Sequence, residues 1–395
     1  MKTGDRLASR NLAGFLRDER FLRVLGQVIF LILVGALLVY LADNMLSNMR
    51  RQGLSLSFSF LRLTSGFDIG EALIDHQRSD SFARAFLVGL LNTLLVSALG
   101  IVLATVLGVF FGIARLSTNF LVRQIARTYI EFLRNIPLLV FLIFLYVGAF
   151  IKLPRVSNAI TLPGPVYLSN RGLAIPGGIP SETFPAYTMI LAGGLLLAVA
   201  VAFALTRYGK RTGRTPLIIP WSLLAVALTA VLGWLLLPVP PLNPDPPVVQ
   251  GLRVSGGLQY TPEFMALLTG LSVYTSAFIA DVVRAGIQAV PRGQVEAAKS
   301  LGLTSFLILR LIVLPQALRV IVPPLTSQYL NLIKNSSLAV AIGYPELFHV
   351  TGTILNQSGR TVEMVTLVMA TYLSISLATS ALMNWYNQRV RLVER

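Results

Sequence analysis

Long apolar segments recur along the chain, and a shorter polar stretch separates each segment from the next. An α-helix needs roughly 20 consecutive apolar residues to cross a hydrocarbon core about 30 Å thick. Segments that approach or exceed this length lie at residues 21–41, 82–113, 130–151, 186–205, 217–237, 263–283, 314–333 and 362–383. The pattern predicts an all-α, polytopic membrane protein with about eight transmembrane helices.

The composition supports a membrane protein and argues against a soluble domain, a disulfide-bonded protein and a metalloprotein. Of the 395 residues, 54% are hydrophobic and only 13% are charged, whereas a soluble domain carries roughly 25% charged residues. The sequence contains no cysteine and only two histidines, His76 and His349, which are far apart. Disulfides and cysteine-ligated metals are therefore excluded, and we expect neither a metal site nor catalytic residues in this chain.

The formal net charge is +16. Such a charge in a soluble protein would indicate nucleic acid, but here the basic residues occupy short loops beside apolar segments, so we expect contact with membrane lipid and no nucleic-acid partner. They concentrate in the loops at 114–129, 206–216 and 284–313. These loops, and with them both termini, are predicted to be cytoplasmic. The predicted outer loops are poorer in basic residues, with the exceptions Arg50, Arg51, Arg62, Arg78, Lys152, Arg155 and Arg171.

A basic, helix-prone loop runs from Val290 to Pro324 between two of the apolar segments. Its first part, Gln294 to Leu301, consists largely of good helix formers. Gly302 suits the position just past a helix end, and Thr304 or Ser305 can cap a second short helix.

Three residues of this loop favour contact with another protein. Ala297 and Ala298 present almost no side chain, so a partner surface can approach the backbone closely. Glu296 lies near the predicted helix start, where the helix dipole favours an acidic group that can pair with a basic partner residue. The residues by themselves predict a docking element and nothing more specific.

The order Glu296-Ala297-Ala298, then Gly302, then an apolar approach to Pro315 resembles the cytoplasmic coupling loop of ABC-transporter permease subunits. The wider segment 272–315 is similar to permeases of the polar and basic amino-acid uptake branch. Further blocks that agree with this branch lie at 89–117, 129–139 and 334–346. The family often has Glu where Asp281 stands and Thr where Ser336 or Ser337 stands.

The resemblance covers the five-helix core of the family and leaves the rest of the chain as additions. The first two core helices fall within residues 82–151, and the remaining core helices with the coupling loop fall within 263–387. An extra helical hairpin at about 186–237 and an added N-terminal segment resemble the larger permease of general L-amino-acid importers of Gram-negative bacteria.

The parts of the chain outside the five-helix core are assigned from the same order of apolar segments. Residues 1–81 are predicted to form a cytoplasmic N-terminus, an uncleaved signal-anchor helix and a periplasmic connection. Residues 152–262 hold the inserted loops and the extra hairpin, and residues 388–395 form a cytoplasmic tail. The inserted loops are rich in Pro and Gly at 163–185 and 238–247. Such segments form either extended connectors or ordered lids, and we expect extended connectors.

The resemblance implies a permease subunit of an ATP-driven importer in the bacterial inner membrane. In this family two permease subunits form a pore, a cytoplasmic ATPase dimer docks on their coupling loops, and a periplasmic amino-acid-binding protein delivers the substrate. It places Glu296, Ala297, Ala298 and Gly302 in the ATPase groove. The sequence has no phosphate-binding loop of the G-x-x-x-x-G-K-[ST] type, so ATP and Mg would be bound by the separate ATPase. The pore is either a homodimer or a pair with a related second permease, and the resemblance to general amino-acid systems, which are two-permease assemblies, implies the pair.

Polar residues inside apolar segments are costly and are therefore candidates for the substrate pathway. The candidates are Thr93, Tyr274, Asp281, Gln328 and Asn331. A structural role remains open for two of them, because Thr93 can bond its own helix backbone and Asp281 lies three residues before Arg284, at the spacing of a helix ion pair.

An ion-gradient-driven amino-acid carrier is the alternative function, and a membrane-embedded enzyme is a third. A carrier predicts carboxylates in the middle of apolar segments, or inverted repeats with broken helices. Such carboxylates are nearly absent here, and no internal repeat is found. An enzyme would need clustered His, Asp or Glu, which the sequence lacks. The exact range of amino acids stays open.

Overall fold

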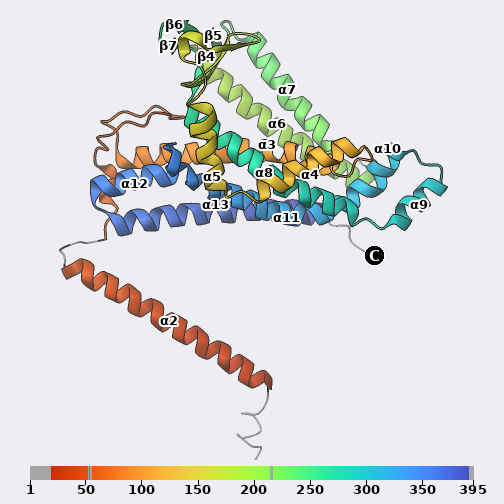
Figure 1. Cartoon of the computed structure of the whole chain (residues 1–395), viewed down its shortest axis with the longest axis horizontal. Coiled ribbons are helices and arrows are strands. Elements are labelled where there is room, and N and C mark those ends of the chain that lie inside the picture. The colour runs from red at the N-terminus through yellow and green to blue at the C-terminus, as the bar shows by residue number, and fades with distance from the viewer. Residues whose placement is uncertain (1–18, 52, 54–55, 214–216, 391–395) are drawn as a thin grey trace, which may run out of the picture. The chain divides into compact units, whose positions relative to one another are not determined.

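The computed structural model describes residues 19–51, 53, 56–213 and 217–390, and it is dominated by helices (Figure 1). The chain divides into two units, Met1–Phe60 and Leu61–Arg395. The first unit holds α2 (Glu19–Arg51), the helix predicted as a signal anchor. The second unit begins within a short 3-10 helix, η1 (Ser59–Arg62), and contains all the elements below.

Six of the described helices are long and apolar enough to cross a membrane. Besides α2 they are α3 (Phe82–Ala114), α6 (Phe184–Thr212), α8 (Pro262–Gln288), the segment around α11 (Leu314–Asn335) and α13 (Thr361–Val390). A seventh crossing results if the bent pair Phe120–Arg134 and Leu138–Phe150 is counted as one span. The remaining predicted segment is α7 (Ile218–Leu236), whose apolar helical part, Pro220–Leu236, is shorter. The prediction of about eight transmembrane helices is thus approximate, although every predicted segment contains helix.

The segment 130–151 is not the single straight helix that the sequence predicts. Helix α4 (Phe120–Arg134) ends before Pro137, and α5 (Leu138–Ile143) continues through the π-helical η2 (Phe144–Phe150) after a bend of 105°. Proline disfavours helical geometry in the residue before it, and Pro137 itself is extended as the N-cap of α5. The bend separates an amphipathic helix from a short apolar one.

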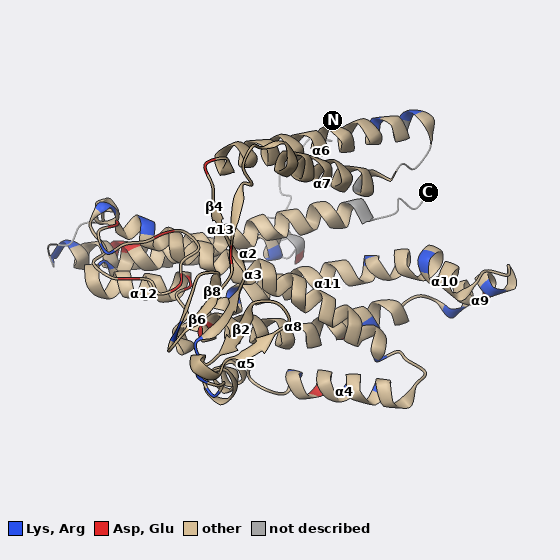
Figure 2. Ribbon diagram, turned by 90° about the horizontal axis from the view of Figure 1, so that it is seen from above, with Lys and Arg blue, Asp and Glu red and all other residues tan. Residues whose placement is uncertain are grey.

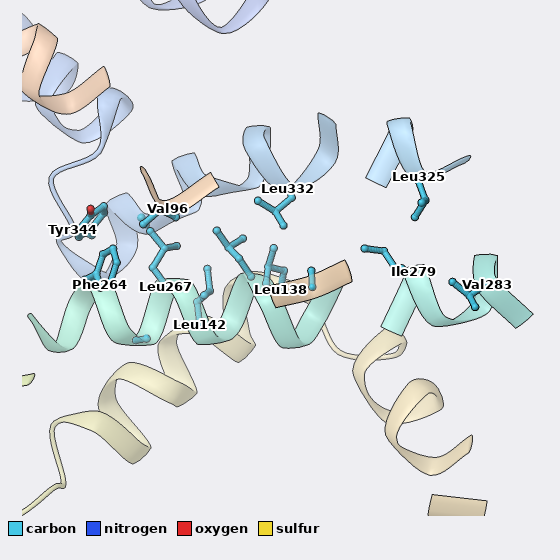
Figure 3. Close-up of a cluster of buried hydrophobic side chains, with 14 of the residues drawn as sticks. Val96, Leu138, Leu142, Phe264, Leu267, Ile279, Val283, Leu325, Leu332 and Tyr344 are labelled. Carbon is cyan, nitrogen blue, oxygen red and sulfur yellow. The ribbon is translucent and has the colours of Figure 1, made fainter. Parts of the chain in front are cut away.

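Helix α8 is the centre of the core and packs against α3, α4, α5 and α11. Small residues on α3 allow the closest approach: a side chain added at Gly108 would come within 2.5 Å of Ile279, and one at Gly112 within 2.8 Å of the Ala280 carbonyl oxygen. Ala104, Gly108 and Gly112 recur at four-residue spacing, which is the small-residue pattern of close helix packing in membranes. Figure 3 shows the apolar side chains that fill the remaining space.

The other end of α8 leads into a loop and then into the last helices. Helices α9 (Arg292–Ser300) and α10 (Ser305–Ile308) precede the π-helical η4 (Leu309–Val313), which continues into α11. After α11 come the 3-10 helix η5 (Ser336–Ile342) and α12 (Leu347–Ser358). Figures 1 and 2 place α9 and α10 at one end of the helices of this unit and α12 at the other.

The two Pro- and Gly-rich loops are ordered, so the prediction of extended connectors is wrong. The first loop holds η3 (Val156–Asn158), β1 (Ile160–Leu162), β2 (Val166–Ser169), β3 (Gly172–Ile175) and β4 (Gly177–Pro180). The second holds β5 (Leu242–Asp245), β6 (Val248–Gln250), β7 (Arg253–Ser255) and β8 (Leu258–Tyr260). Antiparallel pairing of β3 with β8 and of β4 with β5 joins the loops, because each loop satisfies the backbone groups of the other.

Between the two loops, α6 and α7 form the predicted extra hairpin and lie side by side (Figure 2). Their contact is close, since a side chain added at Gly194 would come within 2.0 Å of the Thr229 hydroxyl oxygen. Most of the large apolar side chains of the hairpin are exposed, among them Leu196, Trp221 and Leu236. Such a surface is stable only in an apolar solvent such as lipid or against another apolar surface.

Candidate functional site

The loop between α8 and α11 has the local structure that its sequence predicts. Helix α9 ends in a Schellman motif, in which the Leu303 N–H donates to the Ala298 carbonyl at 3.2 Å and the Gly302 N–H donates to the Lys299 carbonyl at 2.9 Å. Gly302 has a φ of +76°, a left-handed conformation that favours glycine. Thr304 caps α10 by accepting the Leu307 N–H at 3.4 Å. The loop therefore holds two short helices at a fixed turn.

The residues expected to face a partner do not all do so. Glu296 and Ala297 are exposed, whereas Ala298 is only 3% exposed and packs inward. The small face available to a partner thus consists of Ala297 alone, and Ala298 is small because its own chain surrounds it. Sequence reasoning also missed Leu301 and Phe306, which are 80% and 67% exposed and add apolar area to the same loop.

A pocket of about 290 Å³ lies beneath α9. It is lined by the end of α8, by α9 and by η4, through Ile287, Val290, Arg292, Val295, Glu296, Lys299 and Val313. Four of these lining side chains are apolar, and the other three carry charges of both signs. The loop therefore presents an acidic residue, a small residue and a partly apolar recess on one exposed element.

Asp281 sits at the centre of an ion-pair cluster that ties three helices together. Its carboxylate lies 3.0 Å from Arg115 just after α3, pairs with Arg134 at the end of α4, and lies 3.3 Å from Arg284 on its own helix. The Asp281 side chain is 19% exposed. The sequence predicts only the Arg284 contact, because the other two arginines are brought close by tertiary packing.

Thr93 lies in a second polar network near the start of α12. Its hydroxyl donates to the Gly89 carbonyl at 3.0 Å and accepts the Leu347 N–H at 2.9 Å. The neighbouring Asn92 amide donates to the carbonyls of Glu71 and Pro345. Thr93 is fully buried, so its position in this structure is that of a structural residue that joins α3 to α12.

Glu346 completes this network and was not a candidate from the sequence. Its carboxylate caps α12 by accepting the Phe348 and His349 N–H groups, and it accepts the Tyr372 hydroxyl at 2.9 Å. Burial raises the pKa of Glu346 to about 7, because a desolvated carboxylate is disfavoured. The sequence signal for this role is the position of Glu346, directly after Pro345 and directly before an apolar helix, where an acidic residue can cap the helix.

The other pathway candidates lie on two helices, Tyr274 on α8 and Gln328 with Asn331 on α11. Tyr274 on α8 is half-buried and its ring lies 5.1 Å from that of Phe278. Gln328 is half-buried and Asn331 is exposed on α11. Thr93 and Asp281 belong to the two networks described above. Gln328 and Asn331 are three residues apart on α11, and the pathway assignment of Tyr274, Gln328 and Asn331 stays a prediction.

The chain matches known transport proteins over most of its length. A family model described as "Binding-protein-dependent transport system inner membrane component" matches residues 100–392. The chain is 45% identical to the putative amino-acid ABC transporter permease protein YhdX of Escherichia coli, over 94% of each chain. It is 43% identical to the general L-amino acid transport system permease protein AapQ of Rhizobium johnstonii, over 96% of this chain and 94% of the relative.

A third relative has a similar extent. The glutamate/glutamine/aspartate/asparagine transport system permease protein BztB of Rhodobacter capsulatus is 39% identical over 98% of both chains. Each of these matches spans the inserted loops and the hairpin as well as the core. The chain therefore belongs to the family of binding-protein-dependent transport system inner membrane components.

Proposed function

We propose that the chain is the permease subunit of an ATP-driven ABC importer that moves L-amino acids across the bacterial inner membrane. The observation that carries this proposal is the identity of about 39–45% to amino-acid permeases over nearly the whole chain. The exposed Glu296 and Ala297 on α9 support it, because an importer of this kind needs a docking element for its ATPase.

The energy source belongs to a partner in this proposal. The sequence lacks a G-x-x-x-x-G-K-[ST] loop, whose backbone amides and lysine hold nucleotide phosphates in P-loop ATPases. A cytoplasmic ATPase dimer therefore binds ATP and Mg and docks on α9 through Glu296, Ala297 and Gly302, with Ala298 supporting the helix from inside. A periplasmic amino-acid-binding protein delivers the substrate, and a related second permease completes the pore.

The proposed topology follows from charge and chain direction. The basic loops at 114–129 and 284–313 are cytoplasmic by the positive-inside rule, so α9 and both termini lie in the cytoplasm. The start of α8 and the strands then lie on the periplasmic side, since β8 immediately precedes α8 and α9 follows its other end.

Movement of α9 reaches the membrane part of the chain through two helices. Helix α8 enters the loop and η4 with α11 leaves it, and these two helices pack against each other. Asp281, two turns before the end of α8, is ion-paired with arginines beside α3 and α4. A displacement of α9 when the ATPases close is therefore transmitted to four packed helices as a unit rather than absorbed in a flexible loop.

A charge reversal on the loop tests the proposal. Glu296→Lys should remove the acidic anchor, uncouple ATP hydrolysis from uptake and leave membrane insertion intact. Glu19→Lys makes the same change in charge at an exposed position at the start of α2 and should leave uptake unchanged. The measurement is amino-acid uptake and substrate-stimulated ATPase activity in vesicles that contain the whole transporter. Normal uptake by the Glu296→Lys transporter would reject α9 as the docking element.

A further inference from the structure

The two inserted loops form one ordered element, here called the β-cap (residues 151–183 and 238–261). Pairing of β3 with β8 and of β4 with β5 joins its halves across the α6–α7 hairpin. Gly172 marks their closest approach: it has a φ of +108°, and the Tyr260 carbonyl occupies the space where a side chain would stand. The β-cap is therefore a shaped surface and not a pair of tethers.

Four cations gather on the β-cap. Lys152, Arg155, Arg171 and Arg253 are all exposed, and within the described residues none of them lies within ion-pair distance of a carboxylate. The Asn170 N–H donates to the Pro154 carbonyl at 2.8 Å, which brings the neighbours Arg155 and Arg171 to the same place. η3, which follows Arg155, packs on β2 and β7, and β7 begins with Arg253.

Two of these cations, Arg171 and Arg253, line a recess in the β-cap. A pocket of about 160 Å³ is lined by residues of β2, β3, β7 and β8 and includes Tyr167, Arg171, Arg253 and Gln259. The β-cap has two acidic residues: the Asp245 carboxylate accepts the Gly257 N–H at 2.8 Å, and the exposed Glu182 does not line the recess. The surface around the recess is thus positive, with a tyrosine and arginines of the kind that anchor protein interfaces.

The position of these cations is unusual for a membrane protein of this topology. Lys and Arg in short loops normally lie on the cytoplasmic side, where they set orientation. In the topology proposed above the β-cap lies on the opposite side, so its cations act against the orientation signal. These cations therefore need an explanation other than orientation in the membrane. A charged protein surface speeds and orients association with an oppositely charged protein.

We propose that the β-cap is a docking surface for an acidic face of the soluble binding protein. This proposal rests on the proposed function, and the family description itself makes transport dependent on a binding protein. Arg171 and Arg253 at the recess form the contact, and Lys152 and Arg155 extend the positive field around it.

Docking on the β-cap is coupled directly to α8. Strand β8 ends one residue before the Thr261 cap of this helix, and the Tyr260 ring stacks on Phe264 with ring centroids 4.9 Å apart. The Glu71 carboxylate accepts the Thr261 N–H at 3.1 Å and its hydroxyl at 2.5 Å. A displacement of the β-cap on docking is therefore transmitted to the start of α8. The other end of α8, about 40 Å away at 1.5 Å per residue, leads into α9.

The experiment uses the intact transporter in lipid nanodiscs and its purified amino-acid-binding protein as the probe. Association is measured at low and high salt for the wild-type chain and for Arg171→Glu/Arg253→Glu. We expect association at low salt to slow by about tenfold or more and to lose most of its salt dependence, because electrostatic steering is lost. Arg207→Glu with Arg123→Glu makes the same change in charge at exposed positions away from the β-cap and should leave association unchanged.

The outcomes separate this inference from the proposed function. Unchanged association and salt dependence in the Arg171→Glu/Arg253→Glu transporter would overturn the β-cap assignment while leaving the permease intact. Loss of bound anionic phospholipid without a change in association would overturn it in favour of a lipid contact. A wild-type chain that neither retains an ATPase nor responds to any binding protein would instead reject the proposed function. ATPase retention by the variant complex shows that it has folded and assembled.

Discussion

The hydroxyl of Thr93 on α3 accepts a hydrogen bond from the backbone N–H of Leu347 at 2.9 Å, across a separation of 254 residues in the chain. The Leu347 N–H is one of the first donors of α12, and no earlier turn of that helix exists to accept it. Helix α12 therefore begins on α3, with Glu346 capping the next two N–H groups. A residue that the sequence suggested for the substrate pathway thus supports the helix packing.

Replacing Thr93 tests this role. Thr93→Val keeps the shape but leaves the buried Leu347 N–H without an acceptor, which costs about 1–3 kcal/mol of folding free energy. Thr93→Ser keeps the hydroxyl and should lose clearly less. Thermal unfolding of the detergent-purified protein measures both, and an equal loss in the two variants would contradict the hydrogen-bond account.

The same network predicts a dependence of stability on pH. Burial holds the pKa of Glu346 at about 7, above its usual 4.5. Below pH 4.5 the carboxyl is protonated in both states, whereas between pH 4.5 and 7 the unfolded chain ionises first. Stability therefore falls as the pH rises through this window, by at most about 3 kcal/mol.

The variant Glu346→Gln isolates this contribution, because the amide cannot ionise. We expect the difference in unfolding temperature between pH 5 and pH 8 to shrink in this variant. Glu182→Gln, at an exposed position, should retain the wild-type difference. If both variants follow the wild-type pH profile, Glu346 is not the group responsible.

Asp281→Asn should destabilise the packing of α3, α4 and α8. The change leaves Arg134 without its carboxylate partner. Breaking a fully buried pair costs roughly 3–5 kcal/mol, but the Arg134 side chain is 44% exposed, so we expect about 2 kcal/mol. Asp68→Asn breaks the exposed pair with Arg78 and should leave the unfolding temperature unchanged. Similar effects of the two substitutions would show that the Asp281 cluster is no more than a surface pairing.

Two glycines of the loop form a matched pair. Neither Gly293 nor Gly302 has a neighbouring atom within 4 Å of an added side chain, but only Gly302 has a positive φ. Gly302→Ala should cost about 1 kcal/mol from backbone strain alone and reduce ATPase coupling, whereas Gly293→Ala should retain it. Coupling is measured as amino acid transported per ATP hydrolysed. Equal coupling in the two variants would mean that the turn between α9 and α10 does not need its left-handed residue.

The absence of cysteine from the sequence allows a direct probe of the docking face. Ala297→Cys places a thiol on the exposed side of α9, and Ala298→Cys places one on the buried side. A short thiol-to-amine cross-linker should join the first variant to the ATPase subunit and the second much less. Efficient cross-linking at position 298 would indicate that α9 turns or unwinds in the complex.

Local chemistry explains which features could be read from the sequence. Apolar length alone predicts the transmembrane helices, and Gly302 with Thr304 predicts the turn between α9 and α10, because a helix end depends on a few adjacent residues. The bend at Pro137 was also visible in principle, but the unbroken apolar run from Leu138 to Ile151 favoured one helix over the whole segment.

Features that depend on distant residues could not be read in the same way. The strands of the β-cap have three or four residues each, too short to show an alternating pattern, and β3 pairs with a strand beyond the α6–α7 hairpin. The partners of Asp281 on the α3 and α4 side and the Thr93–Leu347 bond likewise exist only once the helices have packed. The pattern predicts elements, and the packing decides which polar groups meet.

The energy source of transport distinguishes an ATP-driven importer from an ion-driven carrier. The measurement is amino-acid uptake into vesicles that contain the chain, its ATPase, its second permease and binding protein, with ionophores present to collapse every ion gradient. Uptake by an ATP-driven importer should continue under these conditions, require ATP and the binding protein, and stop when the ATPase is omitted. Uptake by the chain alone that follows an imposed ion gradient and ignores ATP would contradict the proposed function.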